Sequence, residues 1–256
     1  MIRPTAVLLF SAAMGLAQLE PPRLGCFLDQ AGLLRSVYGV RANFILGPVL
    51  ESGVVSAACS ERLALVKTEE ALEWLDLDAQ LSRRWVAPSG PALFGLSPDG
   101  MPALVYFPRT SEWFRLAQGE LLPLAFDFAT PDGSVLAIAQ PDANRMAAVI
   151  ARDGRLWLLK VRLADGQLEE ETELDGVSAP LLLRPDGAIL FASGPGLVLR
   201  TSNGAERRTP LPAHPAALDP MGSRWVHLGL AEPGGHMALL MLENREELYR
   251  LPEAPR

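Results

Sequence analysis

A unit of short apolar strands separated by tight turns recurs about every forty residues in this 256-residue chain, from about Leu24 to Pro252. Proline, aspartate and glycine suit the second, third and fourth positions of a type I turn, so a shared Pro-Asp-Gly pattern marks the repeat. It occurs in Ser97-Pro98-Asp99-Gly100, Thr130-Pro131-Asp132-Gly133 and Arg184-Pro185-Asp186-Gly187. Short strands between such turns predict an all-β fold.

A second recurring segment sets the period of the repeat. Similar strand segments, most of them carrying an aromatic residue, begin about 39 to 50 residues apart, which is the length of a four-stranded propeller blade. They are Cys26-Phe27-Leu28-Asp29, Glu73-Trp74-Leu75-Asp76, Glu112-Trp113-Phe114-Arg115, Leu156-Trp157-Leu158-Leu159, Leu197-Val198-Leu199-Arg200 and Glu247-Leu248-Tyr249-Arg250. The tryptophans at this spacing are expected to pack between neighbouring sheets.

We therefore predict a β-propeller of about five or six four-stranded blades. One assignment places the units at about 53–88, 91–127, 133–175, 178–212 and 222–252, with Trp225-Val226-His227-Leu228 as the last inner strand. That last unit lacks an outer strand, and an N-terminal hairpin (26–29, then 33–39) can complete it. We expect this hairpin to close the ring. A two-layer β-sandwich would explain the short strands but not the recurring aromatic strand.

The turn-containing passages Gly95-Leu96-Ser97-Pro98-Asp99-Gly100, Phe128-Ala129-Thr130-Pro131-Asp132-Gly133 and Leu183-Arg184-Pro185-Asp186-Gly187 resemble the Ser-Pro-Asp-Gly repeats of WD40-like and TolB-type bacterial propellers. The period covers most of the chain, but the motif itself is short. The first and last units depart from it, with Ser60-Glu61-Arg62 and Glu232-Pro233-Gly234-Gly235 at the expected turns. The resemblance implies a protein-binding or scaffolding role in the cell envelope and brings no catalytic residues.

The N-terminus has the pattern of an export signal. Arg3 precedes an apolar stretch, and Gly15 and Ala17 stand at positions −3 and −1 of a cleavage site before Gln18. We predict a signal peptide over residues 1–17 and a single propeller domain over 18–256, exported to the periplasm or outside the cell. The apolar stretch is shorter than the roughly 20 residues of a spanning helix, so no membrane span is expected.

Two cysteines, Cys26 and Cys59, would meet an oxidising environment after export. They are candidates for a disulfide, although each also lies in an apolar run where a free buried thiol packs well. The formal net charge of −7 and the absence of a basic stripe argue against nucleic-acid binding, because phosphate neutralisation supplies most of that affinity.

Motifs for chemistry are missing from the sequence. There is no Gly-x-Ser-x-Gly elbow, His-Glu-x-x-His pair, phosphate-binding glycine loop or Cys-x-x-Cys. We therefore expect no catalytic residues, no metal and no cofactor. His227, assigned to the last inner strand, is the one candidate for a residue of the central channel.

Propeller ligands usually bind the loops that join a second to a third strand and an outer strand to the next inner strand. The first kind of loop is expected to carry Arg109, Arg152, Asp153 and Arg245, and the second kind His214 and Asp219. The favoured hypothesis is an exported module that binds a protein, peptide or other ligand, or serves as a scaffold. The alternatives are a hydrolase or lyase acting in the funnel on a glycan, lactone or other small molecule, and a structural subunit of an envelope assembly.

Overall fold

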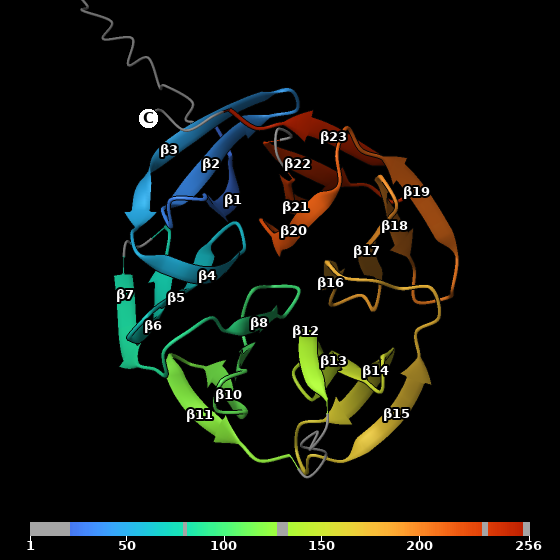
Figure 1. Cartoon of the computed structure of the whole chain (residues 1–256). Coiled ribbons are helices and arrows are strands. Elements are labelled where there is room, and N and C mark those ends of the chain that lie inside the picture. The colour runs from blue at the N-terminus through green and yellow to red at the C-terminus, as the bar shows by residue number, and fades with distance from the viewer. Residues whose placement is uncertain (1–20, 79–80, 127–132, 232–234, 253–256) are drawn as a thin grey trace, which may run out of the picture.

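The chain forms a ring of six antiparallel sheets around a central axis (Figure 1). This computed structural model describes residues 21–78, 81–126, 133–231 and 235–252. Five of the sheets have four strands and one has three. The prediction of an all-β propeller is therefore confirmed, with six blades. The predicted signal peptide, residues 1–17, lies outside the described residues.

Chain order and spatial order agree in every sheet, so each blade is a simple meander. The N-terminal sheet consists of β1 (Arg23–Leu28), β2 (Leu34–Val40) and β3 (Asn43–Glu51). The next three blades are β4 (Val54–Cys59), β5 (Leu63–Thr68), β6 (Ala71–Asp76), β7 (Leu81–Val86); β8 (Leu93–Leu96), β9 (Ala103–Phe107), β10 (Glu112–Ala117), β11 (Glu120–Leu124); and β12 (Ser134–Asp142), β13 (Arg145–Arg152), β14 (Arg155–Arg162), β15 (Leu168–Glu173). The last two are β16 (Leu181–Leu183), β17 (Ile189–Ser193), β18 (Gly196–Arg200), β19 (Glu206–Pro210); and β20 (Pro215–Pro220), β21 (Trp225–Leu230), β22 (His236–Met241), β23 (Glu246–Arg250).

The core lies between the faces of neighbouring sheets, and burial falls from the second strand to the outer strand. All five residues of β9 are buried, whereas β15 (LEEETE) is almost entirely exposed. Trp113 illustrates the packing role expected of the aromatic strand, since it is buried in a cluster with Met146 and Ile150 of the next blade. No helix in the described part of the chain is long and apolar enough to cross a bilayer.

Two of the Pro-Asp-Gly segments form the expected turns between the first and second strands of their blades. The Gly100 amide donates to Ser97 O at 2.8 Å, and the Gly187 amide donates to Arg184 O at 3.0 Å. Gly100 has φ +86°, which a residue with a Cβ rarely adopts. In the third segment, residues 130–132 lie outside the described residues.

The meander gives the ring two distinct ends. Turns from first to second strand and from third to fourth strand emerge at one end, which we call the turn face. Turns from second to third strand and the connections between blades emerge at the other end, which we call the loop face. Each loop residue can therefore be assigned to a face from the strands that it joins.

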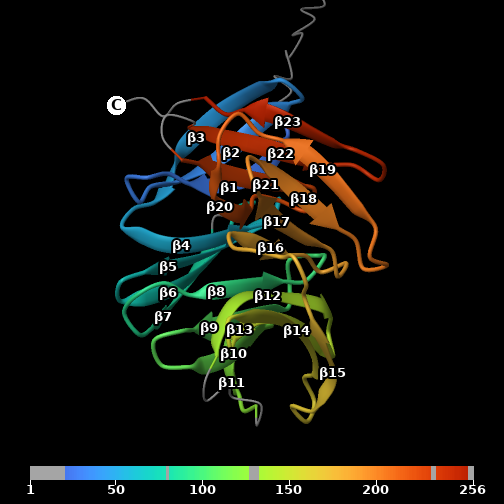
Figure 2. The same ribbon diagram turned by 45° about the vertical axis from the view of Figure 1, so that its right-hand side comes forward.

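The N-terminal hairpin closes the ring, but in a different way from that predicted. The last blade has its own outer strand, β23, and its inner strand is β20 rather than residues 225–228. The hairpin, extended by β3, is a separate sheet between the blades of β20–β23 and β4–β7 (Figures 1 and 2). The prediction began the last blade one strand late, because β20 contains two prolines and two alanines that conceal a strand pattern.

Strand direction shows which blade position the N-terminal sheet lacks. β1 begins near the turn face, where Arg23 pairs with Asp78 after β6, and ends near the loop face, where Gly32 O accepts from the Val54 amide. It thus runs like a second strand, and β1–β3 match strands two to four of the other blades. Among the described residues five inner strands surround the axis, with β20 against β4.

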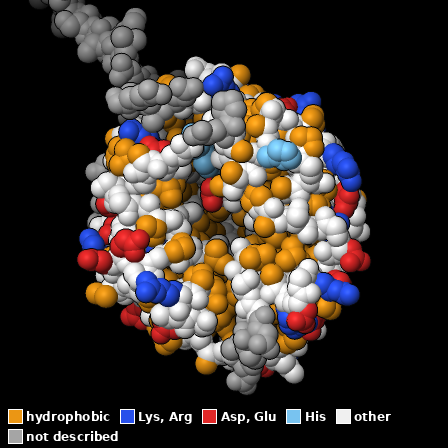
Figure 3. Space-filling view, in the orientation of Figure 1, with side chains coloured by type: hydrophobic (Ala, Val, Ile, Leu, Met, Phe, Trp, Pro, Cys, Tyr) orange, Lys and Arg blue, Asp and Glu red, His pale blue; other side chains and the backbone are white. Residues whose placement is uncertain are grey.

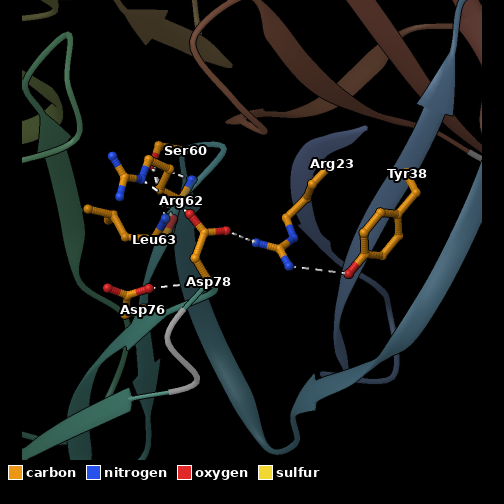
Figure 4. Close-up of polar contacts among 7 residues, drawn as sticks. All are labelled: Arg23, Tyr38, Ser60, Arg62, Leu63, Asp76 and Asp78. Atoms are coloured by element: carbon orange, nitrogen blue, oxygen red, sulfur yellow. Dashed lines mark hydrogen bonds and ion pairs between the residues drawn. The ribbon is translucent and has the colours of Figure 1, made fainter. Parts of the chain in front are cut away.

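Several contacts hold the N-terminal sheet in the ring. Cys26 and Cys59 form a disulfide with their Cα atoms 5.7 Å apart, and the Cys26 amide donates to Met221 O at 3.2 Å. At the turn face, Asp78 accepts from Arg23 at 2.9 Å and from Arg62 at 3.2 Å (Figure 4). The sheet is therefore attached to the blades on both of its sides.

Candidate functional site

An apolar cavity of about 320 Å³ lies on the axis of the ring. Its volume is at the lower end of the range found for small-molecule sites. Its lining comes from the ends of the inner strands and the turns that follow them, mainly Ser60, Phe94, Leu96, Ser97, Ile138, Ala139, Leu182, Arg184, Asp186, Ser223 and Trp225. The cavity therefore belongs to the turn face.

The wall of the cavity is built from apolar side chains that are not completely buried. Phe94, Leu96 and Leu182 are partly exposed although they sit at the centre of the ring. At the opposite end of the ring, which the space-filling view shows, apolar side chains likewise surround the hollow at the axis (Figure 3). Exposed apolar surface in a concave site favours a ligand with an apolar body.

One polar side chain in the wall has no partner within the protein. Ser97 is 8% exposed, and its hydroxyl makes no hydrogen bond to any residue that the structure describes. On the neighbouring strand β12, the fully buried Gln140 amide is likewise unpaired within the described chain. Buried polar atoms are nearly always hydrogen-bonded, so the Ser97 hydroxyl is left for a hydrogen bond that the described protein residues do not supply.

Two charged side chains stand among the described residues of the lining, and they pair with each other. Nε and Nη2 of Arg184 both donate to Asp186 Oδ2 at 3.3 Å, across the Pro185 turn. The Arg184 side chain is 18% exposed and that of Asp186 is 58% exposed. The pair therefore lies at the edge of the cavity, with Asp186 toward solvent.

His227, predicted as a channel residue, lies elsewhere. It is on the second strand β21, is 3% exposed and faces the seam with the N-terminal sheet, because the inner strand of this blade is β20. Its Nδ1 is 3.3 Å from Asp219 Oδ2, its Nε2 is 2.9 Å from His236 Nδ1, and the Phe27 ring packs on both histidines. Burial, and then the neighbouring His227, lowers the pKa of His236 against the opposing effect of Asp29.

The residues predicted for the loop face are divided between several places. Arg109, Arg152, Asp153 and His214 do lie on the loop face. Asp219 is not in a loop but on the inner strand β20, and Arg245 joins the third to the fourth strand of its blade, on the turn face. Both displacements follow from starting the last blade one strand late.

The side chains on the loop face mostly make contacts within the protein. Arg152 pairs with Glu171 and lies over the Trp157 ring at 4.8 Å, and Arg109 donates to Ser89. Asp153 occupies a turn position with φ +53°. His214 is exposed, and its carbonyl accepts from the Ala231 amide. These contacts bring no set of reactive groups together.

Lys67, on the second strand β5, has a fully buried side chain. Its Nζ donates to Thr68 O and to Glu69 O, at 3.4 Å for the latter, and burial lowers its pKa. No substrate can reach this amine in its buried position. Nor do the described residues contain three or more His, Cys, Asp or Glu side chains grouped to hold a metal ion.

Sequence reasoning missed the cavity residues for an identifiable reason. Ser97, Arg184 and Asp186 were recognised as turn formers, which accounts fully for their presence. That these turns converge at the axis follows only from the arrangement of the blades. The apolar segments that precede these turns, at Phe94 to Leu96 and at Leu182, were the sequence feature that could have indicated an apolar cavity.

Comparison with known proteins supports the fold alone. No known family matches the sequence, and neither does any curated protein. A chain of the nidogen/laminin complex superposes with a TM-score of 0.62 at 11% identity, over 90% of this chain and 93% of that chain. Virginiamycin B lyase from Staphylococcus aureus, in an inactive form with quinupristin, gives 0.50 at 12% identity, over 91% and 86%. Hydrazine synthase from Kuenenia stuttgartiensis gives 0.50 at 14% identity, over 91% and 80%.

These three proteins confirm that the chain resembles β-propellers. At such low identities the likeness does not extend to activity. Because the propellers in question come from a protein–protein complex and from enzymes, the fold leaves both binding and catalysis open. The chemistry of the site has to decide between them.

Proposed function

We propose that this protein is a non-catalytic binding module that takes the apolar part of a ligand into the axial cavity. The observation that carries the proposal is the unpartnered, buried Ser97 hydroxyl in a mostly apolar wall. Apolar surface supplies the affinity, and a single placed hydrogen-bonding group orients the ligand. The second polar group, Gln140, lies one residue from Ala139 and Pro141 of the lining.

The lining of the cavity favours binding over catalysis. A hydrolase or lyase needs titratable groups that converge on the reacting atoms. Here the charged lining residues Arg184 and Asp186 neutralise each other at the edge. In the other cluster of titratable groups, His227 and His236 pack against Phe27, and Asp219 contacts His227.

We also propose that the module is exported. The support is the signal-like segment of residues 1–17 together with the Cys26–Cys59 disulfide, since disulfides persist mainly in oxidising compartments. The alternative occupant of the cavity is then an apolar side chain of a protein or peptide partner in the cell envelope. Intact-mass measurement of the chain recovered from a periplasmic extract tests export, because cleavage after Ala17 leaves a defined mass.

Fluorescence titration with N-phenyl-1-naphthylamine tests the binding site directly. This uncharged probe has an aromatic body and one N–H group, and its emission rises in an apolar site. The Leu182→Trp variant fills the cavity and should weaken binding at least about tenfold, which corresponds to about 1.4 kcal/mol. The matched control is Leu122→Trp on the outer strand β11, where the leucine is 47% exposed.

Ser97→Ala adds a second, finer variant. It keeps the cavity but removes the hydroxyl, so a weaker loss of affinity is expected, about two- to tenfold for one hydrogen bond. Saturable binding that persists in a folded Leu182→Trp variant, or that the control variant weakens equally, would contradict the assignment of the cavity. Absence of saturable binding by the wild-type protein would do the same.

A further inference from the structure

A second hollow adjoins the axial cavity on the turn face. It has a volume of about 900 Å³ and lies between the last two blades, β16–β19 and β20–β23. Arg184 and Asp186 line both the axial cavity and this cleft. A ligand can therefore occupy the two spaces together, passing the Arg184–Asp186 pair.

The cleft is rich in arginine although the chain as a whole is acidic, with a net charge of −7. Its charged lining residues are Arg184, Arg207, Arg224, Arg245, Asp186 and Glu243. Four of the lining residues are cations and two are anions, and Glu246 and Glu247 of β23 balance two of the arginines. The attraction for an anion therefore depends on the arginines that these glutamates leave free.

Two of the four arginines are already engaged by glutamates from β23. Arg207 donates to Glu246 Oε1 at 2.6 and 2.9 Å and to Glu243 O at 2.8 Å, and the Glu246 side chain is only 6% exposed. Arg245 pairs with Glu247 at 2.7 Å. These pairs hold the cleft wall in place and leave Arg184 and Arg224 for a ligand.

Arg224 is the group that points to an anion. It is exposed in the turn between β20 and β21, directly after Ser223 of the axial cavity. Within the described residues its guanidinium forms no hydrogen bond or ion pair, and only its carbonyl is used, by the Met241 amide at 2.8 Å. The guanidinium presents a fork of donors that matches a carboxylate, sulfonate or phosphate.

We infer that the ligand is a small organic anion, with its apolar body in the axial cavity and its anionic group in the cleft. The inference rests on the proposed binding function and adds the chemical class of the ligand. Arg224 binds the anionic group, and Arg184 assists from the shared edge, where its long contacts to Asp186 are readily exchanged. Asp186, which lies toward solvent, restricts the anion to the Arg224 side.

The test compares two probes that share one apolar body. N-Phenyl-1-naphthylamine is uncharged, and 8-anilino-1-naphthalenesulfonate carries a sulfonate on the same ring system. The wild-type protein should bind the sulfonate at least about tenfold more tightly, and salt should reduce this preference. Arg224→Gln should remove the preference and leave the affinity for the uncharged probe unchanged.

The matched control is Arg109→Gln, which makes the same change of charge on the loop face. It should leave the affinity for both probes as in the wild type. Equal affinity of the wild-type protein for the two probes, or equal effects of Arg224→Gln and Arg109→Gln, would overturn the inference. In that case a reduced affinity of Leu182→Trp for the uncharged probe would still support the proposed function. Failure of the inference and failure of the proposed function can therefore be told apart.

Discussion

Cys26 on β1 is covalently joined to Cys59 at the end of β4, across 33 residues of sequence and a Cα separation of 5.7 Å. The bond connects the sheet that lacks an inner strand to the inner strand of the neighbouring blade. Both cysteines are almost fully buried, at 1% and 2% exposure. The disulfide therefore fixes the seam where the N-terminal end of the chain enters the ring.

Removing this disulfide should destabilise the fold. Closing a loop of this length restricts the unfolded chain, and its loss is expected to lower the free energy of unfolding by about 2–4 kcal/mol. Urea denaturation of the Cys26→Ser/Cys59→Ser variant measures the effect. Reductant should lower the midpoint of the wild-type protein and leave that of the double variant unchanged; equal midpoints for the two proteins in the absence of reductant would contradict the prediction.

Phe27 packs on the other side of the same sheet, against the last blade. Its side chain is 3% exposed, and its ring lies 5.1 Å from that of His227 and 5.5 Å from that of His236, measured between centroids. Phe27→Ala should leave a cavity at this seam and cost about 3–5 kcal/mol, against a smaller loss for Phe27→Leu. Thermal unfolding of the two variants and the wild type provides the measurement, and stabilities equal to that of the wild type would show that the seam does not depend on this packing.

His236 should make stability depend on pH. Because its pKa is lowered in the folded state from 6.5, the unfolded chain takes up a proton first as the pH falls. Stability is thus complete above about pH 6.5 and declines as the pH falls toward the folded pKa. The melting temperature of the wild-type protein should drop by about 2–4 °C more between pH 7.5 and 5.5 than that of His236→Gln. His214→Gln, at an exposed site, should behave like the wild type.

Two carboxyl groups, those of Glu51 and Glu73, repel each other at the seam between the N-terminal sheet and the β4–β7 blade. Burial, and then the charge of Glu51, raises the pKa of Glu73, while Arg84 at 3.2 Å acts against them. The native state is therefore weakened as the pH rises above 4.5, the ordinary value for this group.

Glu51→Gln should relieve this repulsion and stabilise the protein at pH 7 by about 0.5–1 kcal/mol. The glutamine can keep the bond that Glu51 accepts from the Ser52 amide at 3.0 Å. Denaturation at pH 4 should show a smaller gain than at pH 7, because protonation of the carboxyl groups at low pH removes the repulsion from the wild-type protein. A gain that is the same at both pH values would point to another cause.

Much of the fold could be predicted from local sequence. Pro98-Asp99-Gly100 and Pro185-Asp186-Gly187 specify type I turns through their own backbone preferences, whatever the surroundings. The buried second strands and the exposed acidic outer strand β15 follow from hydrophobic patterning. These features recur often enough to give the blade length and thus the architecture, including the participation of the N-terminal hairpin in the closure of the ring.

The assignment of the last blade failed where local pattern carries too little information. Inner strand β20 reads as Pro-Ala-Ala-Leu-Asp-Pro, and β21 is the more apolar of the two, so the strand count began at β21. That one-strand shift placed His227 at the axis and Arg245 on the loop face. Which strand becomes the inner strand of a blade depends on which strands pair with each other. This pairing exists only in the assembled sheets.

The turns, the short strands and their period depend on backbone preferences and burial within a few residues, so they could be predicted from the sequence alone. The folded ring was needed to show that five inner strands surround the axis, that Ser97 is left unpaired in a mostly apolar wall, and that Arg184 and Arg224 share one cleft. Those relationships join residues from different blades. They exist only once the ring has closed and the turns of separate repeats have been brought to one face.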